Sequence, residues 1–227
     1  SADDSTKVFP AERLHTEGLY QATIPNETRA FSYRVKVVAF DGTEQTLRDP
    51  YSYGPIMGEV DLHLFAEGTD KRLYDKFGAH LREVAGDRGT YFAVWAPNAE
   101  RVSVVGDFNG WDGRVHPMRK LSGVWEIFVP GVSEGAHYKY EIRAAHGALL
   151  LKSDPVGFFS QHGKQTSSMV YDLTRYQWSD GDWMEARREK IWHRSAVSIY
   201  EVHLGSWRRV AEQGNRFLSY LEFAETL

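Results

Sequence analysis

The chain has 227 residues, of which 42% are hydrophobic and 26% charged, a composition typical of a globular protein with one large or two small domains. Its formal net charge is −4 and it has no basic run, so no nucleic-acid partner is expected. The absence of cysteine excludes a disulfide scaffold and is compatible with a cytoplasmic location. No apolar run is long enough to span a bilayer, so no membrane partner is expected either.

Residues 1–48 contain two segments with strand-like alternation, 18–24 and 33–40, and the pair Asp41-Gly42 predicts a hairpin turn after the second. Because two or three strands alone are marginally stable, this region is predicted to be the end of an N-terminal β-sandwich. The polar N-terminus lacks the apolar core of a signal peptide. The missing initiator methionine favours a processed chain or a piece of a longer one.

Residues 49–88 are interpreted as a linker, because Pro50, Gly54 and Pro55 preclude regular structure near its start. A short helix is expected over residues 59–67 and is ended by Gly68.

Residues 89–175 are predicted to form a complete β-sandwich. A strand over residues 91–95 stops before Pro97, and residues 101–105 then alternate, with Val102 and Val104 on one face. Further alternating strands follow in residues 123–130 and 136–143, and short strands at this spacing are typical of a sandwich. The turn-forming run 106–110 places Trp111 at a loop tip, where a large apolar ring is costly unless it binds something.

Residues 176–194 are interpreted as a second linker that contains a charged, solvated segment. Residues 195–227 contain a near-continuous apolar strand, 198–204, followed by a helix from Phe217 with Asn215 as a possible N-cap. The apolar faces of this strand and helix require a parallel α/β sheet that the sequence does not supply. The chain is therefore expected to be an N-terminal portion of a longer enzyme.

The usual catalytic motifs are absent, and the nine histidines lack metal-ligand spacing, so no catalytic residue, metal or cofactor is predicted. The pairs Asp107 with Asp112 and Asp180 with Asp182 are interpreted as turn and cap residues. His203 is either a hydrogen-bonded structural histidine or a sugar contact. A stronger pattern joins Asn109, Trp111 and Lys139, which share one face if their strands pair antiparallel. The ring would stack on a sugar, unless Trp111 instead packs on a neighbouring domain.

Three segments, residues 92–99, 106–113 and 138–140, resemble carbohydrate-binding module family 48, which precedes the catalytic barrel in branching and debranching enzymes. Residues 48–55, 58–68 and 200–208 further resemble the bacterial glycogen branching enzymes. The resemblance implies a mainly β chain with immunoglobulin-like β-sandwiches, one partial and one complete. It also implies that the first strand and helix of a (β/α)8 barrel follow from residue 195.

The resemblance implies an enzyme that cleaves an α-1,4-glucan by retaining two-carboxylate chemistry and transfers the segment to a 6-hydroxyl, making an α-1,6 branch. Its catalytic residues lie on later barrel strands, and none is assigned in this chain. Trp111 matches the module's first stacking tryptophan and Lys139 its hydroxyl donor, whereas residues 148–152 replace the second tryptophan. The implied partners are α-glucan (glycogen, amylose or maltooligosaccharides) and the remainder of the barrel. A debranching hydrolase and a standalone glucan-binding module remain as alternatives.

Overall fold

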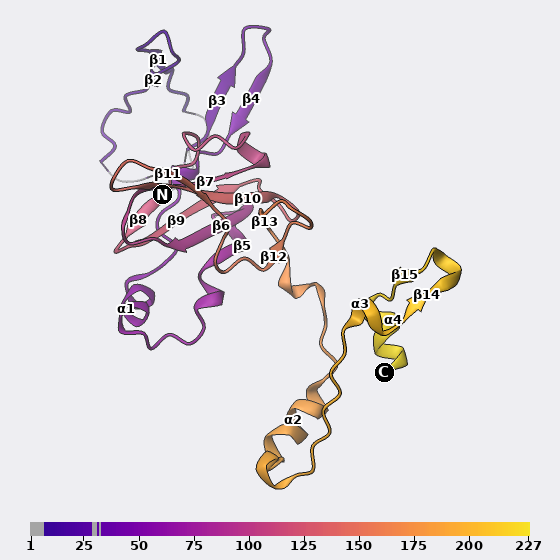
Figure 1. Cartoon of the computed structure of the whole chain (residues 1–227). Helices are drawn as coiled ribbons and strands as arrows, with labels where there is room; N and C mark the ends of the chain where they lie inside the picture. Colours follow the sequence, from indigo (N-terminus) through magenta and orange to yellow (C-terminus); the bar gives the residue numbers. More distant parts are fainter. Residues whose placement is uncertain (1–6, 29–30, 32) are drawn as a thin grey trace. The chain divides into compact units, whose positions relative to one another are not determined.

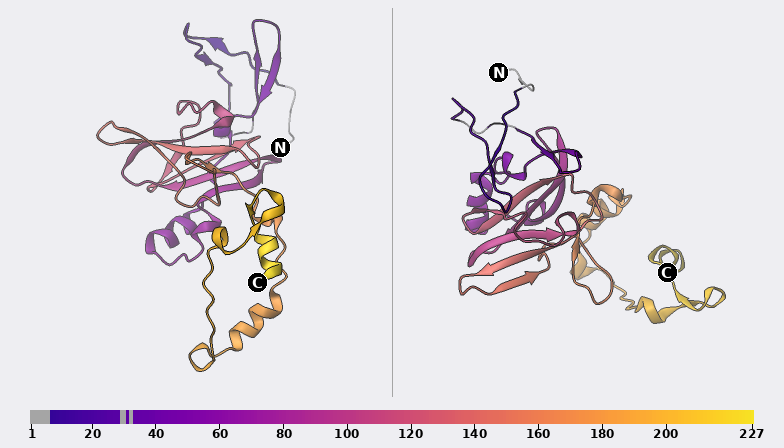
Figure 2. Two further views of the ribbon diagram at one scale, coloured as in Figure 1. Left: turned by 45° about the vertical axis from the view of Figure 1, so that its right-hand side comes forward. Right: turned by 90° about the horizontal axis from the view of Figure 1, so that it is seen from above.

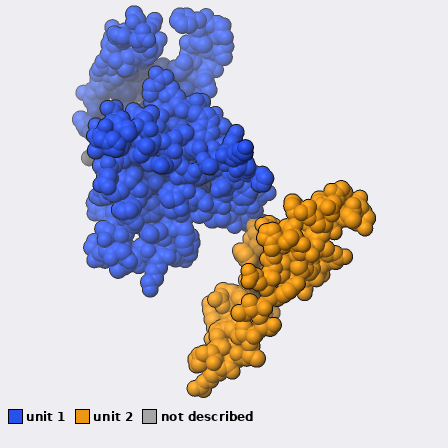
Figure 3. Space-filling model, viewed as in Figure 1, with its two compact units in different colours: residues 1–175 blue, residues 176–227 orange. Residues whose placement is uncertain are grey.

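The computed structural model describes residues 7–28, 31 and 33–227 (Figure 1). The chain divides into two compact units, residues 1–175 and 176–227, which Figure 3 colours separately. No helix among the described residues is both long and apolar enough to cross a membrane.

Two antiparallel sheets form the centre of the first unit (Figure 2). The first has four strands in the order β5-β6-β9-β8, with bounds β5 Gly78–Val84, β6 Asp87–Trp95, β8 Arg119–Leu121 and β9 Val124–Pro130. The second has five: β7 Ala99–Gly106, β10 His137–Ala144, β11 Leu149–Lys152, β12 Phe159–Ser160 and β13 Ser168–Met169. In this second sheet β10 is central and pairs with β7, β11 and β13.

The two sheets share one buried core. Alternate residues of β6 and β7 point into it, among them Phe92 and Val102, and β10 contributes Tyr138 and Tyr140. Trp125 from β9 closes the same core and donates its Nε1–H to Ala96 O at 2.9 Å. The faces agree with those that the sequence pattern predicted, and the predicted complete sandwich is confirmed.

The sandwich begins earlier than the expected boundary at residue 89. Strand β5 lay in the predicted linker, yet it pairs with β6 from Gly78 opposite Ala93 to Val84 opposite Asp87. The two strands are joined by Ala85 and Gly86, which have φ angles of 51° and 82°. A type I′ hairpin turn needs positive φ at both central positions, and an alanine is an unusual choice there, so the turn was not predicted.

Residues 50–77 cover the outer face of the first sheet rather than forming an open linker. They contain two 3-10 turns, Pro50–Ser52 and Leu73–Asp75, and helix α1, Glu59–Glu67. Gly68 ends α1 in the left-handed region with φ 71°, as predicted. Tyr53, Met57 and Phe77 from this segment form a second buried cluster with side chains of β6 and β9.

A buried carboxylate holds the start of this segment to the sheet. Glu126 of β9 is 1% exposed and accepts hydrogen bonds from the backbone N–H groups of Ile56, at 3.1 Å, and Met57, at 2.9 Å. The Tyr91 hydroxyl donates to it at 2.9 Å, and Arg119 lies 3.5 Å away. A buried charge persists only when it is hydrogen-bonded and paired in this way.

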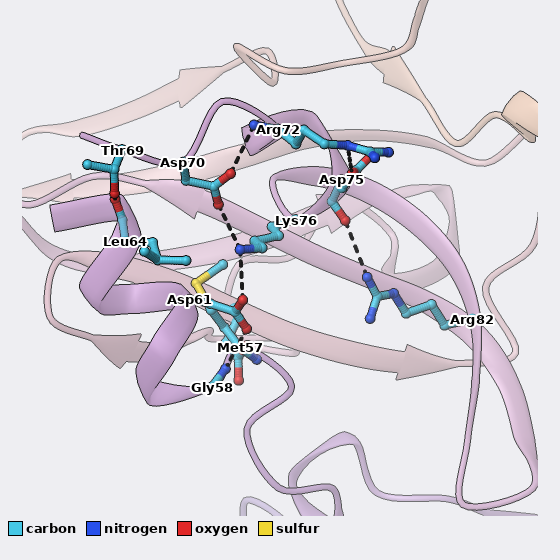
Figure 4. Close-up of polar contacts among 11 residues, drawn as sticks. Met57, Gly58, Asp61, Leu64, Thr69, Asp70, Arg72, Asp75, Lys76 and Arg82 are labelled. Atoms are coloured by element: carbon cyan, nitrogen blue, oxygen red, sulfur yellow. Dashed lines mark hydrogen bonds and ion pairs between the residues drawn. The ribbon is translucent and has the colours of Figure 1, made fainter. Parts of the chain in front are cut away.

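Lys76 contacts carboxylates at both ends of α1 (Figure 4). Its Nζ lies 2.7 Å from a carboxylate oxygen of Asp61, within α1, and 2.7 Å from one of Asp70, just after it. Asp61 also accepts the Gly58 N–H at 3.0 Å, which satisfies an otherwise free donor at the helix start. These contacts fix the helix to the chain that leads into β5.

The N-terminal region forms two separate two-stranded ribbons: β1 Glu12–Arg13 with β2 Tyr20–Gln21, and β3 Val35–Val38 with β4 Glu44–Leu47. The predicted hairpin at Asp41-Gly42 is found, and Thr43 N–H donates to Asp41 Oδ1 at 2.9 Å. The predicted strand over 18–24 is reduced to two residues. These ribbons join neither sandwich sheet, so a partial second sandwich is not formed by the described residues.

The second unit has small elements: α2 Gly181–Glu189, α3 Leu204–Trp207, β14 Arg209–Val210, β15 Arg216–Phe217 and α4 Tyr220–Thr226, with 3-10 turns at Trp192–Arg194 and Ala211–Gln213. A further 3-10 turn, Leu173–Arg175, ends the first unit. The expected charged, solvated segment forms helix α2, which is exposed throughout.

The predicted barrel strand and helix differ in the structure. Residues 198–203 are irregular, and Ile199 is 88% exposed. A strand meant for burial on both faces needs neighbours on both edges to satisfy its backbone groups, and none pairs with it here. The final helix starts at Tyr220, capped by Ser219 rather than Asn215. Asn215 has φ 59° and lies in the turn between β14 and β15.

Candidate functional site

The loop that carries Trp111 leaves β7 at Gly106 and folds over the outer face of the second sheet. A Cβ on Gly113 would lie 2.1 Å from Glu141 Oε1, so the loop packs closely against the Glu141 side chain of β10. The chain then returns alongside β7, where His116 O accepts the Val104 N–H at 3.1 Å.

Trp111 sits in this loop in a strained conformation. It follows the 3-10 turn Asp107–Asn109 and Gly110, and its own φ of 62° lies in the left-handed region, which bulky residues rarely occupy. Its backbone N–H donates to Gly106 O at 3.0 Å, and the residue remains 38% exposed. The predicted position at a loop tip with an accessible ring is therefore found.

Asn109, predicted to contact sugar, has its amide engaged within the loop. Its Oδ1 accepts the Gly106 N–H at 2.9 Å, and its Nδ2 donates to Val104 O at 2.9 Å. A third contact joins Nδ2 to His116 Nδ1 at 2.9 Å. The geometry favours a role in shaping the loop beneath Trp111 over direct hydrogen bonding to a ligand.

The same contacts determine the protonation of His116. The backbone partners orient the Asn109 amide so that an Nδ2–H points at His116 Nδ1, which must accept and therefore carries no proton. Burial lowers the pKa of His116, because a buried imidazolium loses hydration. His116 was not predicted as a loop residue, and its proximity to Asn109 depends on the return of the chain along β7.

Asp107 links the tryptophan to β10. Its Oδ1 accepts the Trp111 Nε1–H at 3.2 Å, and its Oδ2 lies 3.0 Å from His137 Nδ1 and 3.2 Å from His137 N. A carboxylate only accepts, so His137 Nδ1 carries the proton in this pair. Asp107 was interpreted from the sequence as a turn residue, and its bridge to a residue of another strand could be found only from the strand register.

Lys139 lies on the same outer face as this bridge. It pairs with Val105 in the antiparallel β7–β10 ladder, which is the condition the sequence interpretation set for a shared face. Tyr138 and Tyr140 point into the core, so His137, Lys139 and Glu141 point outward. The Lys139 Nζ donates to Thr166 Oγ1 at 3.0 Å. Trp111 and Lys139 are thus brought to one face of the second sheet.

Residues 148–152, which the resemblance implied in place of a second stacking tryptophan, contain β11, an edge strand of this sheet. Its leucines, Leu149 to Leu151, are all exposed. Leu149 and Leu151 pair with Arg143 and Glu141, so they point to the same outer face as Lys139. The same face also carries the exposed ring of Phe159, because Phe159 and His137 both pair with Met169. Among the described residues it therefore offers the rings of Trp111 and Phe159 and an aliphatic border at β11.

Reaction chemistry is not apparent in the described residues. Among them, no three histidine or acidic side chains are placed to hold a metal ion. Asp112 pairs with Arg114 at 2.6 Å, and this guanidinium lowers the pKa of Asp112 to about 2, consistent with a turn residue. His203 contacts Ser206 Oγ through Nδ1 at 2.9 Å, a local hydrogen bond.

The sandwich and its exposed ring can now be compared with known proteins. Residues 76–157 match the family model of carbohydrate-binding module 48, the isoamylase N-terminal domain. The module-48 segment, as residues 76–157 are called below, begins just before β5 and contains Asp107, Trp111 and Lys139. Its start agrees with the pairing of β5 in the sandwich.

The whole chain is similar to curated bacterial proteins. It is 50% identical over 230 residues to the 1,4-alpha-glucan branching enzyme GlgB of Paramagnetospirillum magneticum, covering 100% of this chain and 30% of that protein. It is 52% identical over 217 residues to GlgB of Rubrobacter xylanophilus, covering 95% of this chain and 29% of that protein. The chain thus spans about 30% of the length of these relatives.

A solved structure of ligand-free PulA from Klebsiella pneumoniae is 29% identical over 43% of this chain and 10% of its own. Its TM-score of 0.35 is too low to support a structural argument.

Proposed function

We propose that this chain is part of a 1,4-α-glucan branching enzyme and that its module-48 segment holds α-glucan at Trp111. The proposal is supported by the 50% identity to branching enzymes along the whole chain and by the family match of the segment. In this proposal the residues of the chain bind and orient glucan. The carboxylates that cleave the α-1,4 bond and transfer the segment to a 6-hydroxyl belong to the remainder of the enzyme.

The observation that carries the proposal is the accessible ring of Trp111 on a loop tied down at several points. A pyranose has an apolar face that stacks on a flat aromatic ring, and its hydroxyl groups accept hydrogen bonds from a nearby ammonium. Lys139 provides that ammonium on the same face, beside the hydroxyl of Thr166. A site formed by the ring of Trp111 and the ammonium of Lys139 is suited to weak binding of a long polymer that offers many equivalent sugar units.

The proposal extends to the second unit. Residues 195–227 supply the first strand and helix of the catalytic barrel, and the strand forms when neighbouring strands pair with residues 198–203. The exposure of Ile199 and Tyr200 is consistent with surfaces that become buried in that assembly.

Affinity electrophoresis in gels that contain glycogen tests the glucan site. The unchanged chain is expected to be retarded, and Trp111→Ala is expected to migrate nearly as in a glycogen-free gel. The binding free energy lost in Trp111→Ala should be comparable to that of a base stacked on an aromatic side chain, which is about 1–3 kcal/mol in single-stranded nucleic-acid sites.

The matched control is Trp95→Ala. Trp95 is 57% exposed but belongs to β6 of the first sheet, so its loss should leave retardation unchanged. Retardation of Trp111→Ala equal to that of the unchanged chain would contradict the proposed site.

A further inference from the structure

The carboxylate of Asp107 is shared between the tryptophan loop and the sheet. One oxygen accepts the indole N–H of Trp111 at 3.2 Å, and the other accepts from the backbone and the ring of His137. His137 opens β10, the strand that also carries Lys139. The indole is therefore connected through two side chains to the strand that carries the proposed hydroxyl donor.

The backbone contacts of Trp111 do not by themselves orient its ring. A left-handed conformation at a bulky residue is unfavourable and persists only when its surroundings fix it. The Trp111 N–H to Gly106 O bond fixes the backbone, but it leaves rotation about the side-chain bonds open. The hydrogen bond from Nε1 to Asp107 holds the edge of the ring and so constrains where its face points.

We propose that Asp107 is a positioning residue for the glucan site, because it holds the indole of Trp111 in the orientation that stacks on a sugar. The role depends on the glucan site proposed above. Holding an aromatic ring in its bound orientation raises affinity, since the ordering of the side chain then precedes binding. Asp107 itself touches no sugar in this role.

The positioning role can be distinguished from a purely structural role of Asp107 by comparing fold stability with the orientation of the ring. The Asp107 side chain is 54% exposed, and hydrogen bonds at such positions contribute little to the stability of a fold. A change at Asp107 should therefore leave the unfolding midpoint almost unchanged while it alters the ring. If Asp107 were only a turn residue, its replacement would change neither the indole of Trp111 nor the affinity for glucan.

The first measurement uses the ligand-free chain labelled with ¹⁵N. The indole resonance of Trp111 is assigned by its absence in Trp111→Phe. In Asp107→Ala this resonance is expected to shift and its N–H to exchange faster with water. The control is Asp112→Asn, in the same loop, whose carboxylate pairs with Arg114, and it should leave the Trp111 resonance in place.

The second measurement is calorimetric binding of maltoheptaose, a linear α-1,4 oligosaccharide. Loss of one oriented hydrogen bond predicts that Asp107→Ala weakens binding by about threefold to tenfold. Trp111→Phe keeps a ring but loses the N–H, so it should weaken binding to a similar extent. The double variant Asp107→Ala with Trp111→Phe should then lose no more than either single variant.

The outcomes separate the two proposals. If Trp111→Ala binds maltoheptaose as the unchanged chain does, the glucan site is wrong, whatever the indole spectrum shows. If Trp111→Ala loses binding but Asp107→Ala changes neither the indole resonance nor the affinity, the site stands and the positioning role is overturned. Additive losses in the double variant would also overturn the role, because Asp107 would then act independently of the indole.

Discussion

Trp111 joins an accessible ring to a backbone conformation that is costly for its residue type. The sequence predicted the ring at a loop tip from the turn-forming residues that precede it. It did not predict the two contacts that hold this loop, Asp107 with His137 and Asn109 with His116. Both depend on how other segments of the chain lie alongside β7. Residues 30 positions apart in sequence, such as Asp107 and His137, are joined by strand register, which a single sequence does not reveal.

Replacement of the buried Glu126 is expected to lower the stability of the fold strongly. Replacing it with alanine leaves the N–H groups of Ile56 and Met57 and the Tyr91 hydroxyl without their acceptor in a buried region. The free energy of unfolding is expected to fall by about 3 kcal/mol. Urea denaturation measures the change.

Glu83→Ala serves as the control for that measurement. Glu83 is exposed and pairs with Arg88 at 3.5 Å, so its replacement should change stability by less than about 0.5 kcal/mol. Equal effects of the two variants would mean that Glu126 does not hold the covering segment to the sheet.

The lowered pKa of His116 predicts that the fold becomes less stable as the pH falls below about 6.5. Its pKa is lowered in the folded state by burial, so between the folded pKa and the ordinary value near 6.5 the unfolded chain binds more protons. Stability from this group is therefore fully present above about pH 6.5 and is lost as the pH falls toward the folded pKa.

The comparison with His116→Gln isolates this contribution. Glutamine does not titrate and keeps an oxygen that can accept from Asn109, so the loss of stability between about pH 7 and 5 should be smaller in the variant. Identical pH profiles of the unfolding midpoint would contradict the assignment of His116 as a neutral acceptor.

At the scale of elements, alternation was a reliable guide where one face is buried in a core. The faces of β7, β9 and β10 agree with the pattern because their apolar side chains meet in a single sandwich core. Strand β5 was missed because its turn uses Ala85. The apolar run 198–203 was predicted as a strand, but a pattern of side chains cannot supply the neighbouring strands that such an element needs.

Helix α1 is attached by the ion pairs of Lys76 with Asp61 in its first turn and with Asp70 just after its end. In Lys76→Met the contacts to Asp61 and Asp70 are removed while the aliphatic stem is retained. Two partly exposed pairs contribute about 1 kcal/mol, so amide hydrogen exchange in α1 should accelerate about fivefold while β6 is unchanged.

The matched change is Lys36→Met, which removes an exposed pair with Glu44 on the β3–β4 ribbon. It should not affect exchange in α1. If α1 exchanges at the same rate in Lys76→Met as in the unchanged chain, the apolar contacts of the helix are sufficient to hold it.

At the scale of the whole molecule, the chain corresponds in length to about 30% of its branching-enzyme relatives. Several motifs in order carried the resemblance to these relatives, among them residues 92–99 in and after β6, residues 106–113 in the Trp111 loop and residues 58–68 around α1. The isolated chain is expected to produce no α-1,6 branches in amylose, measured as an unchanged iodine absorption spectrum. A full-length GlgB relative provides the positive control, and a spectral shift with the chain alone would place reacting groups within it.

The central claim, that α-glucan binds over Trp111, is tested most directly by mapping the contact without any substitution. Maltoheptaose is titrated into the ¹⁵N-labelled chain, and the shifts of assigned backbone and indole resonances are followed. If α-glucan binds over Trp111, the largest shifts fall on residues 107–111, on His137 and Lys139, and at Thr166, with the Trp111 indole among them. Shifts that leave the Trp111 loop unchanged, or that cluster around Trp95 on the opposite sheet, would contradict the claim.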